Sequence, residues 1–366
     1  MKVLGIETSC DECAAAVVED GRTILSNVVA TQIPFHAEYN GVVPEIASRM
    51  HTEWISRVVQ EALDKASVDA AGIDAVASAA HPGLLGSLLV GLNFGKAFAW
   101  AKGIPFIAVD HMLAHLYAPR LVMKEETGDK IECPSYPFLG LLVSGGHTII
   151  CRANNFDDIS VLGTTIDDAV GEAFDKVSKH YGFGYPGGAV IDKLAKSGNM
   201  NAFNFPLPRL YKEGRSRKGD HRYDVSYSGL KTAAVNQLDL FRVGAPPPEG
   251  DRPEDIAASF QKTAVDILLR SLFRAVEDTG LTTIVAGGGV AANSYLRAAL
   301  AQRREHTAES EGRSSPSGLR CIFPPLELCG DNGAMIAGIA YQYLARGESS
   351  PLTVTASARV ESFKRR

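Results

Sequence analysis

Leu4-Gly5-Ile6-Glu7-Thr8-Ser9 is the stretch that decides the fold, because its pattern returns later in the chain as Leu139-Gly140-Leu141-Leu142-Val143-Ser144. Each copy is an apolar run that ends in a polar tip, and a second apolar run follows it, which predicts a β-hairpin. Residues 283–289 likewise echo residues 75–80, as a strand that opens into a turn and a helix. Self-similarity of this kind predicts a duplicated unit.

The duplication defines the expected domain organisation. Each half places antiparallel strands first and strand-to-helix crossovers after them, which predicts two mixed α/β domains with a cleft between them. We expect an N-terminal domain at residues 1–135, a C-terminal domain with insertions at 136–346 and a tail at 347–366. The helix that starts near residue 331 is expected to pack back onto the first domain. Both hairpin tips and the Gly287-Gly288-Gly289 turn should face the cleft.

Composition narrows the class of protein. A chain of 366 residues with 45% hydrophobic residues and a net charge of −5 is typical of a globular protein with a large core, and it argues against a polycationic nucleic-acid binder. Glu7 interrupts the first apolar run almost at once, which argues against a signal peptide. The six cysteines then fit a reducing cytoplasm better than a framework of disulfides. Residues 75–95 carry no formal charge, but His81-Pro82-Gly83 divides them and Lys96 follows, so we interpret them as buried core with no membrane span.

Residues 201–228 form the one basic and aromatic segment. An RNA contact would need a local patch of this kind, although a flexible loop has the same composition. Its members are Arg209, Lys212, Arg215, Arg217, Lys218, His221 and Arg222, with Tyr211 and Tyr223 among them.

A candidate metal site begins with two histidines. The apolar run 104–109 predicts a short buried strand, Asp110 ends it, and His111 and His115 fall on the following helix. Residues four apart share a helix face, so both imidazoles can bind one cation, although two ordinary polar residues on an amphipathic helix have the same spacing. No glutamate follows His111, which disfavours metallopeptidase chemistry. Asp331 starts a further helix, where it either caps that helix or completes the metal site.

Other polar clusters follow the predicted strands. Asp11 and Glu12 at the first hairpin tip are either a solvated turn or a place for an ion, a base or a phosphate-directed water. Residues 144–148 have the glycines and hydroxyls that wrap an anion, although a plain hairpin turn needs glycine too. The turn 287–293 leaves room for a flat base or ribose, yet it is neither a dinucleotide fingerprint nor a P-loop.

Two later segments also carry carboxylates. Residues 163–181 predict an acidic helix, which is either a charged outer face or part of a binding site. The glycine turn at 185–188 precedes a helix with Asp192, and carboxylates beside a glycine turn suit the binding of sugar hydroxyls.

Taken together, these residues resemble one family, that of the tRNA N6-adenosine threonylcarbamoyltransferases, which includes the catalytic subunit of the archaeal and eukaryotic KEOPS complex. The likeness runs from residue 3 to about residue 345 in eight ordered motifs. They are GIETSCDE at 5–12, GVVPE at 41–45, HxxxH at 111–115, LVSGGHT at 142–148, DD and GEAFDK within 167–176, YPGG at 185–188, SGLKT at 228–232 and DNGAM at 331–335. Cys13 stands where the family more often has threonine, and residues 308–320 look like a surface insertion.

The resemblance implies the duplicated actin-like ATPase fold and a specific reaction. Members transfer a threonylcarbamoyl group from threonylcarbamoyl-AMP to N6 of the adenosine next to the anticodon, adenosine 37, in tRNAs that read codons beginning with A, and AMP is released. Bacterial members work in the cytoplasm with the paralogue TsaB and the ATPase TsaE.

By the same resemblance, His111, His115 and Asp331 are the ligands of one divalent metal ion, Fe²⁺ in the family and sometimes Zn²⁺. The residues expected to hold the adenylate are Leu142, Val143, Ser144, Gly145, Gly146, Asp175, Gly188, Asp192 and Asn293. An aromatic amine is a poor nucleophile, so we expect Asp11 or Glu12 to remove its proton. The rival hypotheses are an actin-fold small-molecule kinase, a metallopeptidase and a nucleotide-binding scaffold without catalysis.

Overall fold

The computed structural model describes residues 1–39, 41–124, 133–208, 210, 221–242, 252–309, 318–360 and 363–364. Most of the predicted basic segment lies outside these ranges, namely Arg209, Tyr211, Lys212, Arg215, Arg217 and Lys218. Residues 310–317 of the predicted insertion lie outside them as well.

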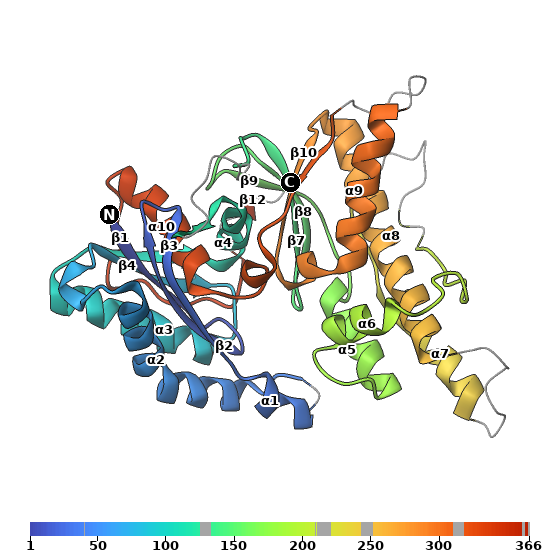
Figure 1. Ribbon diagram of the computed structural model, residues 1–366, viewed down its shortest axis with the longest axis horizontal. Coiled ribbons are helices and arrows are strands. Elements are labelled where there is room, and N and C mark those ends of the chain that lie inside the picture. Colours follow the sequence, from blue (N-terminus) through green and yellow to red (C-terminus); the bar gives the residue numbers. More distant parts are fainter. Residues whose placement is uncertain are drawn as a thin grey trace. The chain divides into compact units, whose positions relative to one another are not determined.

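The chain forms two compact units. The first comprises Met1–Ser135, Asn154–Ile159 and Pro324–Lys364, and the second comprises Tyr136–Ala153, Ser160–Phe323 and Arg365–Arg366. Each unit contains a mixed sheet whose strands are flanked by helices (Figure 1).

The first sheet contains β1 (Lys2–Glu7), β2 (Glu12–Glu19), β3 (Thr23–Thr31), β4 (Ala75–His81), β5 (Phe106–Asp110) and β6 (Val122–Met123). The helices that accompany it are α1 (Ile33–His36), α2 (Pro44–Ala66), α3 (Leu85–Lys102), α4 (His111–Tyr117) and α10 (Gly333–Ala345), with 3-10 turns η1 (Ala37–Tyr39), η2 (Ala70–Gly72), η3 (Ala118–Arg120) and η6 (Leu326–Leu328).

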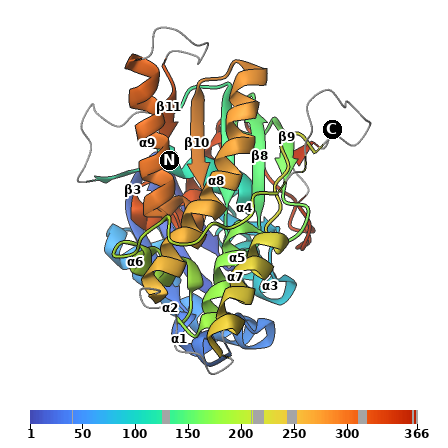
Figure 2. The same cartoon turned by 90° about the vertical axis from the view of Figure 1, so that its right-hand side faces the viewer.

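The second sheet contains β7 (Phe138–Val143), β8 (Thr148–Ala153), β9 (Ile159–Thr164), β10 (Thr283–Gly287), β11 (Arg320–Ile322) and β12 (Phe363–Lys364). Its helices are α5 (Val170–Tyr181), α6 (Gly187–Ala195), α7 (Ser228–Arg242), α8 (Pro253–Thr279) and α9 (Ser294–Glu309), with the 3-10 turn η5 (Gly289–Ala292). Figure 2 shows the long α8, which packs against α6 and α7.

The strand orders confirm the predicted duplication. The first sheet has the order β5-β4-β1-β2-β3-β6, and the second has the order β11-β10-β7-β8-β9-β12. In both, the opening strand pairs antiparallel with the next strand and parallel with the later crossover strand, β4 or β10. The two hairpins and the echo between residues 75–80 and 283–289 therefore occupy equivalent places in the two sheets.

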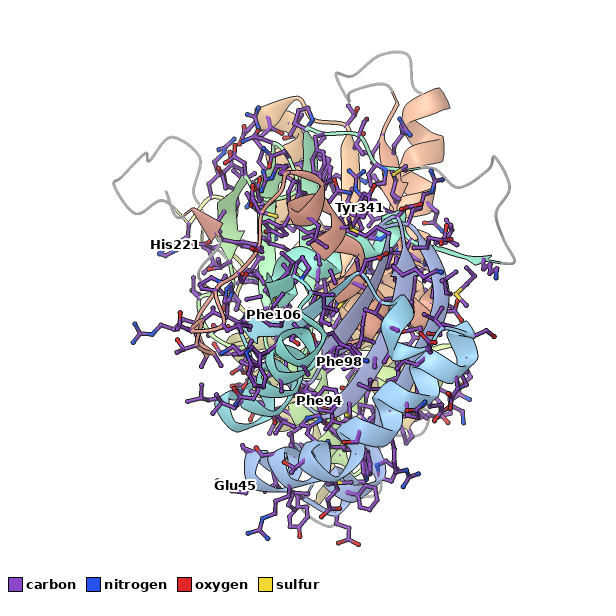
Figure 3. The ribbon with its side chains drawn as sticks, turned by 90° about the vertical axis from the view of Figure 1, so that its left-hand side faces the viewer. Glu45, Phe94, Phe98, Phe106, His221 and Tyr341 are labelled. Carbon is purple, nitrogen blue, oxygen red and sulfur yellow. The ribbon has the colours of Figure 1, made fainter. Side chains whose placement is uncertain are left out.

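The two faces of β1 pack against different helices, because side chains alternate along a strand. Leu4 and Ile6 belong to the core that α2 and α3 complete. Phe94 and Phe98 of α3 pack against that core, to which Phe106 of β5 also belongs (Figure 3). Gly5 points the other way, toward α10.

Helix α10 lies directly on the β1–β2 hairpin because neither partner has a side chain at the contact. A Cβ on Gly5 would lie 2.2 Å from the Gly333 carbonyl oxygen, and a Cβ on Gly333 would lie 2.6 Å from the Ala16 backbone nitrogen. Contacts this short are impossible for real atoms, so both positions require glycine. This approach fixes the start of α10, and with it the residues just before the helix, against the first hairpin.

The predicted acidic helix at residues 163–181 is wrong in its first third. Residues up to Thr164 belong to β9, and α5 begins only at Val170. Asp167 accepts hydrogen bonds from the Tyr227 amide and the Ser226 and Ser228 hydroxyls, and Asp168 pairs with Lys176 and Lys231. These bonds hold the aspartate pair in a turn that joins α5 to the start of α7.

Among the described residues, no helix combines the length and the apolar composition that crossing a membrane requires. Residues 75–95 form β4 and part of α3 instead, as the interruption at residues 81–83 predicted.

Replacing Gly333 with alanine is expected to lower the free energy of unfolding by about 1–3 kcal/mol, since the added methyl group overpacks the contact with the hairpin. Urea unfolding of the purified protein measures this. Gly330→Ala is the matched control, because a Cβ at Gly330 meets nothing within 4 Å. Equal stability of the two variants would contradict the close approach.

Candidate metal centre

His111, His115 and Asp331 form a compact cluster in the first unit. The Asp331 Oδ1 atom lies 3.1 Å from His115 Nε2 and 3.5 Å from His111 Nε2, and the two Nε2 atoms are 3.1 Å apart. Metal bonds of about 2.0–2.2 Å to such atoms place neighbouring ligands about 2.8–3.6 Å apart. The three observed separations therefore fit one divalent cation, and two imidazoles with one carboxylate form a ligand set that leaves open positions.

Helix α4 presents both histidines because a carboxylate caps its start. Asp110, the last residue of β5, accepts hydrogen bonds from the Met112 and Leu113 amides at 2.7 and 3.2 Å. This N-cap fixes the first turn of the helix, so His111 and His115 share one face with ring centroids 4.5 Å apart. Both side chains are buried.

The third member of the cluster comes from the turn before α10. Asn332 caps that helix through the Met335 amide and also donates to the Gly330 carbonyl. The two bonds hold the turn on both sides of Asp331. The cluster therefore depends on the approach of α10 to the hairpin.

Glu7 orients His111, and the sequence analysis did not select it as a site residue. Its Oε2 lies 2.9 Å from His111 Nδ1, while its Oε1 accepts the Ser9 amide hydrogen. A carboxylate on Nδ1 fixes that proton there and turns the Nε2 lone pair toward the other ligands, which is the usual arrangement behind a metal-binding histidine. The signal available in the sequence was a lone acidic residue at the end of a buried apolar strand.

The two histidines differ in protonation when only protein groups surround them. Burial opposes the charged form of His111, but the Asp331 and Glu7 carboxylates outweigh it and raise its pKa to about 9. Burial and the neighbouring His111 lower the pKa of His115. The His111–His115 pair therefore carries one extra proton, at the position where a metal cation would bind.

The tip of the first hairpin lies beside this cluster. Asp11 is buried and shares a side-chain hydrogen bond with Glu12. Burial, together with the charges of Asp331 and Asp11, raises the pKa of Glu12 to about 10. A cation bound at Asp331 would counteract this rise in the Glu12 pKa.

In the second unit, the residues predicted to bind the adenylate line one edge of the second sheet. Leu142 and Val143 are buried at the end of β7, and Gly145 and Gly146 are exposed in the turn that Ser144 closes through its bonds to His147. Strand β10 runs parallel to β7, so its glycine turn reaches the same edge. A Cβ on Gly288 would lie 2.4 Å from the Val143 carbonyl oxygen.

The remaining predicted residues connect the helices around this edge. Asp175 accepts the Gly187 amide hydrogen at 2.7 Å, which ties α5 to the start of α6 beside Gly188. Asp192 accepts from the Ser294 amide and hydroxyl, and Asn293 accepts the Leu296 amide hydrogen at the start of α9. The structure therefore brings the predicted residues to one region of the second unit.

Comparisons with known proteins decide the family. The model of the TsaD family, tRNA N6-adenosine threonylcarbamoyltransferase, matches residues 23–338. A protein of that name from Treponema denticola is 62% identical and covers 100% of this chain and 99% of its own length. This chain belongs to that family. A Borrelia hermsii relative with the same name is 48% identical over 100% of this chain and 98% of its own length.

Solved structures agree on the fold alone. HypF from T. kodakarensis has a TM-score of 0.56 at 14% identity, over 94% of this chain and 48% of its own length. Component A of the Acidaminococcus fermentans (R)-2-hydroxyglutaryl-CoA dehydratase has a TM-score of 0.52 at 12% identity, over 94% of this chain and 99% of its own. The predicted actin-like fold and the predicted family are confirmed.

Glu7→Gln is expected to weaken binding of a divalent metal about 10- to 100-fold, because the amide no longer supports His111 with a full negative charge. Competition against a chromogenic chelator measures the affinity. Glu19→Gln at the far end of β2 is the matched control, and His111→Ala should abolish binding. Unchanged affinity in Glu7→Gln would rule out this supporting role.

Metal affinity is also expected to depend on pH, because binding of one metal ion should release one proton. His111 is protonated below its pKa of about 9, so the metal must displace that proton, and affinity should fall about tenfold per pH unit between pH 8 and 6. The pKa of His115 is lowered by burial and by His111, so we expect His111 to supply the released proton. Calorimetry in two buffers of different ionisation enthalpy counts the released protons, and release of none would contradict this assignment.

Proposed function

We propose that this chain transfers the threonylcarbamoyl group of threonylcarbamoyl-AMP to N6 of adenosine 37 in tRNAs that read codons beginning with A. The observation that carries the proposal is the match, over the full length of the chain, to relatives named for this transfer. The cluster of two histidines and one aspartate supports it, because acyl transfer gains from a cation that can bind a carbonyl oxygen.

His111, His115 and Asp331 would hold the metal, with Fe²⁺ as the expected ion and Zn²⁺ as the alternative. When bound, such an ion supplies Lewis acidity toward an oxygen of the threonylcarbamoyl group. Glu7 contributes by keeping the His111 proton on Nδ1, which leaves Nε2 available as a ligand. Because the helix lacks the glutamate of a zinc peptidase, the chain has no base in the place that peptide hydrolysis would require.

The second unit would bind the adenylate. We propose that the amides of Gly145 and Gly146 contact the phosphate, because glycine lets successive amides converge on an anion. Ser144 would shape this turn, since its amide and hydroxyl are bonded to His147. The base and ribose would lie against Leu142, Val143, Gly188 and Asn293. Asp192 accepts from the Ser294 amide and hydroxyl through Oδ1, so we assign its Oδ2 to a ribose hydroxyl. Asp175 would keep the turn before α6 in place.

The hairpin tip would remove the proton from the attacking amine. In the proposed step, N6 bonds to the carbamoyl carbon, the bond from that carbon to the phosphate oxygen breaks, and one proton leaves N6. Burial and the neighbouring carboxylates raise the pKa of Glu12, so we assign the role of base to the other carboxyl of the tip, that of Asp11. Glu12 then orients Asp11 through their common hydrogen bond.

The partners follow from the family as well. We propose that a TsaB paralogue and the TsaE ATPase act with this chain on tRNA in the cytoplasm, and that a separate synthase supplies the adenylate.

Reconstitution with a tRNA transcript, threonylcarbamoyl-AMP and the partner proteins tests the function, with mass spectrometry of the nucleosides as the readout. Asp11→Asn is expected to lower transfer about 10²- to 10⁴-fold, the usual contribution of a general base, and Glu12→Gln is expected to lower it less. Metal content and adenylate binding serve as controls. Near wild-type transfer by both variants would exclude the carboxylate pair as the base, and turnover of ATP with a small alcohol in place of transfer would indicate a kinase.

A further inference from the structure

A chain of buried polar side chains runs from the start of α2 to the hairpin tip. Gln32, His36 and His51 are each 0% exposed, and none of them belongs to the metal cluster. The Val43 amide donates to His36 Nδ1 at 3.3 Å, and His36 Nε2 lies 3.2 Å from Gln32 Oε1. Gln32 Nε2 lies 3.4 Å from the Ala47 carbonyl oxygen, and 3.4 and 3.5 Å from His51 Nδ1 and Nε2. His51 Nε2 lies 2.9 Å from the Cys10 carbonyl oxygen.

The two ends of this hydrogen-bonded series fix the tautomers of both histidines. A backbone amide only donates, so His36 Nδ1 accepts and the proton of His36 lies on Nε2. A backbone carbonyl only accepts, so His51 carries its proton on Nε2 and accepts at Nδ1. Gln32 connects the two histidines, because its oxygen accepts from His36 while its nitrogen donates to the Ala47 carbonyl and lies against the His51 ring.

The chain ends on the backbone of the proposed catalytic tip. Cys10 directly precedes Asp11, and the Gln32 backbone amide donates to the Asp11 carbonyl at 2.9 Å. The carbonyls of Cys10 and Asp11 thus accept hydrogen bonds from His51 of α2 and from Gln32, which directly precedes α1. On the other side, the Ser9 amide bonds to Glu7 and the Ser9 hydroxyl lies 3.3 Å from His111 Nδ1. The tip is fixed between the histidine chain and the metal cluster.

We infer that Gln32, His36 and His51 are positioning residues, which hold the Cys10–Asp11 backbone so that the Asp11 carboxylate keeps its place beside the metal cluster. This inference rests on the proposed function, since it assigns the three residues a part in the transfer step. None of them touches the reacting atoms. The mechanism is indirect, because a displacement of about 1 Å at a catalytic group can cost about 10²-fold in rate.

The contacts of His51 suit its neutral form, because the Gln32 amide nitrogen lies against its ring. Burial lowers the pKa of His51, although its bond to the Cys10 carbonyl and the charges of Glu7 and Asp11 act in the opposite direction. Neutral imidazoles suit a deeply buried network, because an unpaired buried charge is costly.

His51→Leu removes the donor to Cys10 at nearly constant volume. We expect kcat for transfer to fall at least about tenfold, while KM for threonylcarbamoyl-AMP and the metal affinity stay within about twofold. His51→Gln keeps an N–H donor near the carbonyl and should recover most of kcat. Thr52→Ala, on the exposed face of the same helix turn, is the matched control and should leave kcat unchanged.

Hydrogen exchange of the tip amides gives a readout that does not depend on activity. Residues 9–12 should exchange faster in His51→Leu than in the wild type, with protection restored in His51→Gln. One outcome is that the wild-type protein shows no transfer while exchange at residues 9–12 is still faster in His51→Leu and restored in His51→Gln. In that case the proposed function fails, but the histidines and Gln32 do hold the tip. If the wild type is active and His51→Leu keeps both full kcat and tip protection, the inference is overturned.

Gln32→Leu keeps the proposal testable if His51→Leu does not fold. It removes the central link while His51 keeps its own bond to Cys10, so we expect a smaller loss, about three- to tenfold in kcat, with unchanged KM. A fall in thermal stability with unchanged kcat would show that the chain only supports the fold, and it would reject the positioning role.

Discussion

The contact of α10 with the first hairpin is the constraint on which the candidate metal centre depends. Gly5 and Gly333 have no side chains, so the helix backbone reaches the strand backbone at this point. The turn before the helix then brings Asp331 within 3.1–3.5 Å of two imidazole nitrogens that lie more than two hundred residues away in the chain. A larger side chain at either glycine would separate the carboxylate from its partners.

The same hairpin carries the other half of the proposed chemistry. Its strands are buried on both faces, so the polar groups at its tip need partners inside the protein. These partners lie on two sides of the tip. On one side Glu7 and Ser9 contact His111. On the other side the carbonyls of Cys10 and Asp11 accept hydrogen bonds from His51 and Gln32. One short loop thereby couples the geometry of the candidate metal ligands to that of the carboxylate pair.

The second unit reuses the architecture with different chemistry at the equivalent edge. Where the first sheet ends in carboxylates and histidines, the second ends in a glycine-rich turn and in helix starts joined by Asp175, Asp192 and Asn293. Exposed backbone amides suit a phosphate, whereas buried imidazoles suit a metal. Duplication of one fold has thus placed groups that suit an anion in one unit and groups that suit a cation in the other.

Local patterns in the sequence determined the hairpins, the duplicated order of strands and helices, and the placement of His111 and His115 on one face of a helix. Each depends on neighbours a few residues apart, where the periods of strands and helices act directly. Tertiary structure alone decided that Glu7 supports His111, that α5 begins at Val170 after a turn held from α7, and that His51 is a buried hydrogen-bonding partner of the tip. Those roles depend on partners brought together by packing across long sequence separations, and no local period encodes such contacts.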